Sequence, residues 1–199
     1  LGNPALEPEL VKTTEIQYFY QDNLWSMEVT GFYTELSRLI VSKKIDASGR
    51  TQFINDGKET ISGIESLFNV SVSENVRARL TATHFLTDTV EASYDNFATF
   101  GLFYQGPNWQ ASVNGIWRPN VEITEGLRIS GTNQMFEESE HVLLNARVNY
   151  KTGRHLAWQF SVENLTDENY RAYEPRQNKN QFGVPQLGRQ LRVGVSYQF

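Results

Sequence analysis

Residues 191–199, LRVGVSYQF, alternate strictly along the chain. One face of an extended segment here carries only apolar side chains, those of Leu191, Val193, Val195, Tyr197 and Phe199. The opposite face carries Arg192, Gly194, Ser196 and Gln198. A period of two predicts a β-strand. Soluble domains blunt or cover such strands with charge, so the aromatic ending indicates an apolar environment for one face.

The same alternation recurs through the chain. It is clear in WSMEVTGFY (25–33), NVRARLTATHFL (75–86), WQASVNGIW (109–117), HVLLNARVNY (141–150) and LAWQFSVEN (156–164). No window shows a helical period over three turns. We therefore predict an all-β chain with nine strands, near 10–20, 24–38, 59–73, 75–87, 96–105, 108–118, 139–150, 154–164 and 189–199.

The connections between these predicted strands alternate between short and long. Tight turns at 21–23, 73–75, 106–107 and 151–153 are rich in turn-forming residues. The segments near 39–58, 88–95, 119–138 and 165–188 are long. Outer-membrane barrels sort their connections in this way, and their strands are long with aromatic residues at both ends. The pattern predicts an antiparallel, up-and-down transmembrane β-barrel, with a soluble β-sandwich as the alternative.

Composition narrows the classes of function. The net charge of -5 argues against a nucleic-acid partner, and the absence of cysteine excludes disulfides and thiolate metal sites. The negative mean hydropathy is compatible with a barrel, because alternation hides the apolar face. His84, His141 and His155 fall on separate predicted strands, so no metal site is expected. His141 is expected to be solvated, with contact to a ligand as the alternative. Nucleotide, zinc-protease and hydrolase motifs do not occur, so we predict no enzyme, catalytic residue or cofactor.

Four short motifs occur in order along the chain: GNPALEPE (2–9), FINDG (53–57) followed by GIE (63–65), VENLTDENY (162–170), and GR (188–189) before the last strand. Together with the aromatic ending, they resemble the C-terminal part of a TonB-dependent outer-membrane receptor. That resemblance implies a barrel of about 22 strands around a plug domain. Residues 1–199 would then hold about the last nine strands, and the plug, the TonB box and the earlier strands are expected to lie outside them. The odd strand count and the opening without methionine favour a part of a longer protein.

The resemblance also implies a function and partners. It implies TonB-dependent uptake of a scarce nutrient chelate across the Gram-negative outer membrane, with ferric siderophore as the leading substrate and haem, cobalamin and oligosaccharide left open. The implied partners are TonB acting through the plug, the nutrient chelate, outer-membrane lipid and the barrel-assembly machinery, with the protein a monomer. A passive porin-like channel is the alternative within the membrane class.

Three groups of residues are expected to carry this function. The polar strand face would contact the plug, through Glu65, Arg77, Arg79, Arg147 and Arg192 above all. The long connection before the last strand would meet the ligand, through Tyr170, Arg171, Tyr173, Arg176 and Gln177, because aromatic rings and guanidinium groups suit an anionic, oxygen-rich chelate. Within it, Asn164 and Asp167 are expected to form turns. Tyr197 and Phe199 would be read by the barrel-assembly machinery.

Overall fold

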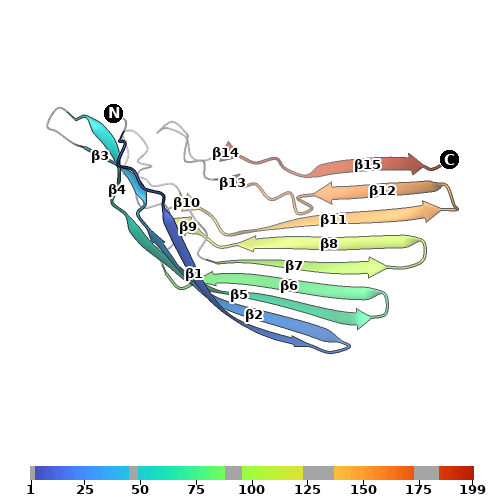
Figure 1. Ribbon diagram of the computed structural model, residues 1–199. Helices are drawn as coiled ribbons and strands as arrows, with labels where there is room; N and C mark the ends of the chain where they lie inside the picture. The colour runs from blue at the N-terminus through green and yellow to red at the C-terminus, as the bar shows by residue number, and fades with distance from the viewer. Residues whose placement is uncertain (1–2, 45–48, 88–95, 123–136, 173–183) are drawn as a thin grey trace.

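The computed structural model describes residues 3–44, 49–87, 96–122, 137–172 and 184–199. All regular structure in these ranges is β-strand, and nine strands form one antiparallel sheet in chain order (Figure 1). Their bounds are β1 Leu10–Gln21, β2 Trp25–Ser37, β5 Lys58–Ser73, β6 Val76–Phe85, β7 Asn96–Gln105, β8 Trp109–Arg118, β11 His141–Thr152, β12 Leu156–Glu163 and β15 Gln190–Tyr197. These are the nine predicted strands, with ends displaced by a few residues. None of the described segments is a helix long and apolar enough to cross a membrane.

The predicted sorting of connections is confirmed. Four tight connections lie at one end of the sheet, which we call the turn end, and the long connections lie at the other, the loop end (Figure 1). The nine strands share one sheet rather than two packed layers. The β-sandwich alternative is therefore wrong for the described part of the chain.

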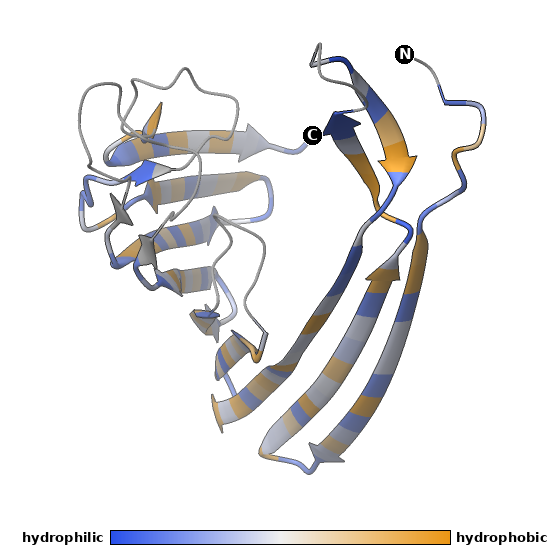
Figure 2. Cartoon of the chain, turned by 90° about the vertical axis from the view of Figure 1, so that its left-hand side faces the viewer, coloured by the Kyte–Doolittle hydropathy of each residue, from blue (hydrophilic) through white to orange (hydrophobic). Residues whose placement is uncertain are grey.

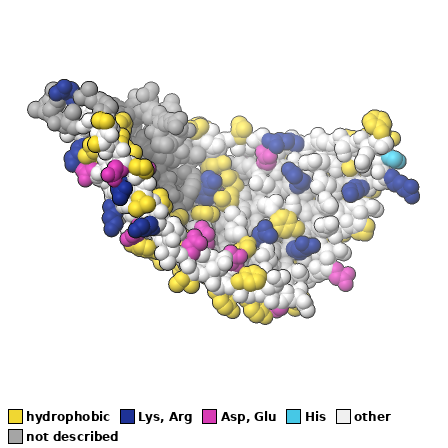
Figure 3. Space-filling model, viewed as in Figure 1, with side chains coloured by type: hydrophobic (Ala, Val, Ile, Leu, Met, Phe, Trp, Pro, Cys, Tyr) yellow, Lys and Arg dark blue, Asp and Glu magenta, His cyan; other side chains and the backbone are white. Residues whose placement is uncertain are grey.

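The pairing register places most apolar side chains on one face and most polar side chains on the other, and hydropathy alternates along the strands in Figure 2. One face, the apolar face, carries Leu191, Val193 and Val195, which are 72%, 68% and 57% exposed. Ile16, Phe68, Leu80, Leu102 and Phe160 point to the same side and are also exposed. So large an uncovered apolar surface is unsuited to water and suited to lipid. The sheet curves into an open trough whose polar face is concave (Figures 2 and 3).

An aromatic belt lines the apolar face at the turn end. Its members are Tyr20, Trp25, Tyr104, Trp109, Tyr150, Trp158 and Tyr197. Neighbouring rings touch across the strands, with Trp109 stacked on Tyr150 at 4.1 Å between centroids and Tyr20 tilted against Trp25 at 4.6 Å. At the loop end the indole N–H of Trp117 donates to Glu140 at 2.7 Å. Aromatic side chains at both ends of an apolar band are the arrangement expected at the two interfaces of a bilayer.

Three short pairings occur within the long connections and were not predicted from the sequence. They are β3 Ile40–Lys44 with β4 Thr51–Asn55, β9 Val121–Glu122 with β10 Glu137–Glu138, and β13 Arg171–Ala172 with β14 Val184–Pro185. The first forms a separate hairpin beyond the loop end of β2 and β5. Strands of two to five residues are too short to show a period of two, so their pairing depends on the tertiary structure.

Candidate functional site

Ten polar side chains lie together on the polar face, among them the five that the sequence is expected to direct toward the plug. They are Glu28, Thr30, Glu65, Arg77, Arg79, Asn145, Arg147, Gln159, Glu163 and Arg192. Register connects them: Thr30 lies opposite Glu65, Asn69 opposite Arg79, and Ser161 opposite both Arg147 and Arg192. A set of polar side chains on the concave side of a long-stranded sheet can contact water, a ligand or a second protein surface.

Some of these groups are paired within the sheet. Arg192 makes a two-pronged ion pair with Glu163, with Nη1–Oε1 at 2.8 Å and Nη2 donating to Oε2 at 3.1 Å. Arg79 donates from Nε to the amide oxygen of Asn69 at 2.8 Å. Two of the predicted plug contacts, Arg79 and Arg192, therefore already have neighbours within the sheet that hold them in place.

Arg77 and Arg147 differ from those two. Within the described residues, no ion pair or hydrogen bond involves either guanidinium group. Both side chains are exposed on the concave face, and a direct series of register partners joins them through Phe103 and Ser112. These two cations are therefore available to a partner outside the described residues.

A concavity of about 570 Å³ lies on the polar face beside the last long connection. Its polar lining includes Asn145, Arg147, Glu163, Gln186 and Gln190. Amide, carboxylate and guanidinium groups around a space of this size can hold a polar small molecule or a side chain of a docked surface.

The base of this connection is built by Asn164 and Asp167, as predicted. Asn164 is 7% exposed; its side chain donates to the carbonyl of Glu168 and accepts from the N–H of Glu168, both at 2.8 Å. Asp167 accepts the N–H of Arg189 at 2.7 Å through Oδ1. Both residues have positive φ, a conformation that asparagine and aspartate tolerate better than other side chains do. These two residues fix the entry to β15.

His141 and Tyr170 pack together beside this base. Their rings are stacked with centroids 4.6 Å apart, and His141 is only 3% exposed. The prediction of a solvated His141 is wrong, because Tyr170 returns from the far side of the NLTD turn to cover the first residue of β11. Tyr170 still lines the 570 Å³ concavity, while Arg171 is exposed at the start of β13. Tyr173, Arg176 and Gln177 lie outside the described residues.

The family model described as "TonB dependent receptor-like, beta-barrel" matches residues 1–165. The chain belongs to this family. Proteins of the family are outer-membrane transporters of Gram-negative bacteria rather than enzymes. A search of curated proteins finds no match.

Solved structures of several such receptors share the fold of this chain. The ferric enterobactin receptor PfeA from Pseudomonas aeruginosa, in a mutant form with enterobactin, superposes with a TM-score of 0.82 at 17% identity, over 99% of this chain and 32% of that one. The FrpB iron transporter from Neisseria meningitidis gives 0.76 at 17% identity, and the siderophore receptor PirA from Acinetobacter baumannii gives 0.76 at 15%, each over 98% of this chain and 32% of the other. The chain thus spans about a third of the length of these receptors.

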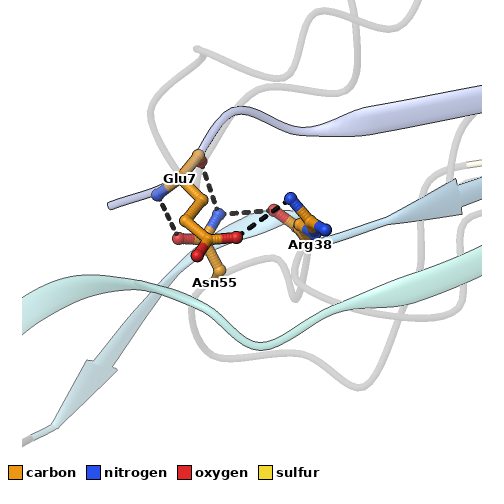
Figure 4. Close-up of polar contacts among 3 residues, drawn as sticks. All are labelled: Glu7, Arg38 and Asn55. Carbon is orange, nitrogen blue, oxygen red and sulfur yellow. Dashed lines mark hydrogen bonds and ion pairs between the residues drawn. The ribbon is translucent and has the colours of Figure 1, made fainter. Parts of the chain in front are cut away.

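The receptor's first two motifs meet in one clamp at the loop end (Figure 4). Asn55 donates from its side-chain nitrogen to the carbonyls of Glu7 and Arg38, at 2.8 and 2.7 Å, and accepts the N–H of Glu7 at 2.8 Å. Arg38 closes the clamp with an ion pair to Glu7 at 2.9 Å. Arg38 has positive φ, so the chain bends here between β2 and β3. The motifs were visible in the sequence, but their contact with each other was not.

Tyr197, the last residue of β15, lies on the face that the alternation of side chains predicts. Tyr197 is 60% exposed on the apolar face, and the chain just beyond it is fixed by two hydrogen bonds between His155 and Gln198. Phe199 packs edge-on against Tyr197 with ring centroids 5.3 Å apart. A role of these aromatic residues in barrel assembly stays a prediction.

Proposed function

We propose that residues 1–199 form about the last nine strands of a receptor barrel of about 22 strands, and that the whole protein takes up a nutrient chelate by TonB-dependent active transport. The main support is the sheet itself: a curved antiparallel sheet with an exposed apolar face, an aromatic belt and a polar concave face, in a chain of the TonB-dependent receptor family. The plug domain and the TonB-contacting segment belong to the rest of that protein.

Ferric siderophore is the substrate class that we propose. Among the similar solved structures are a ferric enterobactin receptor, a siderophore receptor and an iron transporter, although a copper transporter also superposes, with a TM-score of 0.71. The sequence of the connection between β12 and β15 contains tyrosine, arginine and glutamine residues, which we expect to contact the ligand. Guanidinium groups and aromatic faces suit an anionic chelate whose surface is rich in oxygen.

Uptake by the full-length protein tests this proposal. The gene would be expressed in a Gram-negative strain that lacks its own receptors for the compounds tested, and cells would be given ferric enterobactin, haem or cobalamin. We expect accumulation of the ferric chelate against its gradient, and loss of accumulation when TonB is deleted. Uptake that stops at equilibrium and is independent of TonB would instead identify a passive channel.

A further inference from the structure

Aromatic residues on β2 and β8 mark the loop-end edge of the apolar band. On β2, Tyr33 follows Trp25 on the same face, and on β8 Trp117 follows Trp109 by the same interval. Each interval, from 25 to 33 and from 109 to 117, holds the roughly nine residues that a tilted strand needs to cross the hydrocarbon layer. Because Trp25 and Trp109 belong to the aromatic belt at the turn end, Tyr33 and Trp117 mark the opposite interface. Long connections of such barrels face the cell exterior, so this is the interface with the outer leaflet.

The apolar face has a low point just inside this interface, at Gly31. The register partners of Gly31 are Ile16 on β1 and Ile64 on β5. These two side chains are 79% and 41% exposed, whereas nothing lies within 4 Å of a Cβ added to Gly31. Gly31 therefore lies lower than the two isoleucines that project on either side of it. In a bilayer, the group that covers such an apolar depression is a hydrocarbon chain.

The next row toward the loop end carries hydroxyl groups on the same face. Thr14, Tyr33 and Ser62 are register partners across β1, β2 and β5. At the usual spacing of strands this row is about 10 Å wide. Hydroxyl groups both donate and accept hydrogen bonds, so a row of three at the interface suits a headgroup that does the same.

Two lysines flank a glutamate beyond the hydroxyl row, again on the same face. Lys12 lies opposite Glu35, and Lys58 lies diagonally across from Glu35, with its Nζ 4.0 Å from Oε1. Within the described residues, no ion pair or hydrogen bond involves the amine of Lys12. The lysines are two strands and two residues apart, so about 12 Å separates their backbones. The cluster thus presents a cation on each side and one carboxylate between them.

We propose that this surface binds a glycolipid of the outer leaflet whose disaccharide carries two phosphates. An acyl chain lies over Gly31, the sugars lie against the hydroxyl row, and Lys12 and Lys58 each meet one phosphate. Amines at a membrane interface attract phosphate, and the hydrogen bond between two charged groups is strong. Glu35 would repel a phosphate placed at the centre, but it accepts hydrogen bonds from sugar hydroxyl groups there. A lipid with one phosphate would leave the second lysine without an anion.

This inference goes beyond the proposed function and is independent of the substrate that is transported. It needs only the outer-membrane location of the family.

Native mass spectrometry of the full-length receptor in detergent tests the site. The receptor is titrated with lipid A carrying two phosphates, lipid A carrying one, cardiolipin or phosphatidylglycerol. One variant combines Lys12→Gln with Lys58→Gln, and another, Gly31→Leu, fills the low point. The matched control combines Lys43→Gln with Lys44→Gln, which removes two charges from the exposed β3–β4 hairpin outside the site. Heat-modifiable migration in gels shows that each variant is folded.

We expect lipid A with two phosphates to bind about tenfold more tightly than each of the other three lipids. The Lys12 and Lys58 double variant should weaken this binding about tenfold and Gly31→Leu severalfold, while the control changes it less than about twofold. Equal affinity for lipid A with one phosphate, for cardiolipin or for phosphatidylglycerol would overturn the proposal. Unchanged affinity in either site variant, or an equal loss in the control, would overturn it as well.

Discussion

Asn55 and Glu7 are hydrogen-bonded to each other in both directions, at 2.8 Å each way, across 48 residues of sequence. The side chain of Asn55 makes hydrogen bonds to the backbone of the segment before β1, in the way that the backbone of a neighbouring strand would. Arg38 joins the same clamp, and Lys43 pairs with Asp56 close by. These contacts fix the β3–β4 hairpin at the loop end as an extension of β2 and β5. Two of the chain's motifs, GNPALEPE and FINDG, thus help to position the β3–β4 hairpin.

Asn55→Ala should release the β3–β4 hairpin from the segment before β1. Three hydrogen bonds are lost, so we expect a cost of roughly 1–3 kcal/mol to local stability. Hydrogen exchange of the Glu7 amide and protease cleavage within 38–57 should both become faster in the full-length receptor. Ser42→Ala, on the exposed side of the same hairpin, is the control and should change neither rate. Equal protection in both variants would show that the clamp is dispensable.

Asn164→Ala should loosen the start of β15. The change removes the side-chain bonds to Glu168 and places alanine at positive φ, for a combined cost of about 2–4 kcal/mol. We expect faster hydrogen exchange at the amides of Glu168 and Arg189. Thr166→Ala, exposed in the same turn, should leave these rates unchanged. If exchange at Arg189 stays slow in Asn164→Ala, Asp167 alone holds the turn.

Gly115→Ala should destabilise the barrel wall through a steric clash. A Cβ at Gly115 would overlap the ring of Phe100 on the neighbouring strand, and overpacking of this kind costs about 1–3 kcal/mol. Gly31→Ala is a matched control on the apolar face, because nothing lies within 4 Å of its added Cβ. The urea midpoint of the refolded receptor should fall for Gly115→Ala only, and Phe100→Ala should relieve the difference. Equal midpoints for both glycine variants would exclude the clash.

The β1–β2 turn should weaken in acid. The N–H groups of Trp25 and Leu24 donate to Asp22 at 2.9 and 2.7 Å and lower the pKa of this carboxyl below its ordinary 3.8. A lowered native pKa means that Asp22 stabilises the turn above its unfolded pKa and loses this contribution as the pH falls through the native one. Exchange at the Leu24 amide, corrected for intrinsic rates, should rise below about pH 4. Asp22→Asn should flatten this pH dependence; a persistent acid response would assign it to another group.

Phe199→Ala should reduce the assembly of the full-length receptor in the outer membrane. Phe199 is fully exposed beyond the apolar face of β15, where an assembly factor can reach it. The measurement is the amount of folded, heat-modifiable receptor in isolated outer membranes. Gln198→Ala is the control, because the hydrogen bonds of Gln198 to His155 involve only its backbone. Equal amounts of folded receptor in both variants would remove the proposed role.

The alternation of side chains was sufficient to predict the nine long strands and their two faces. In a strand of eight or more residues, the alternation of polar and apolar side chains allows only one choice of which face is polar. A shift of the strand register by one residue would turn Arg77 or Arg147 toward the lipid. The residues of the polar face could therefore be read directly from the sequence. The same holds for Asn164 and Asp167, whose short polar side chains suit positive φ.

Only the tertiary structure decided which distant residues meet. The alternation of side chains predicts which face of the sheet a residue occupies, but it does not predict which charged groups pair or how deeply a residue at a strand end is buried. The pairing of Arg192 with Glu163, the burial of His141 under Tyr170 and the clamp of Asn55 on Glu7 all depend on strand register and on the path of the long connections. The sequence by itself determined a membrane-type sheet with one polar face. The fold decided that Arg192 has the carboxylate of Glu163 beside it while Arg77 and Arg147 have none among the described residues, because strand register sets which side chains meet.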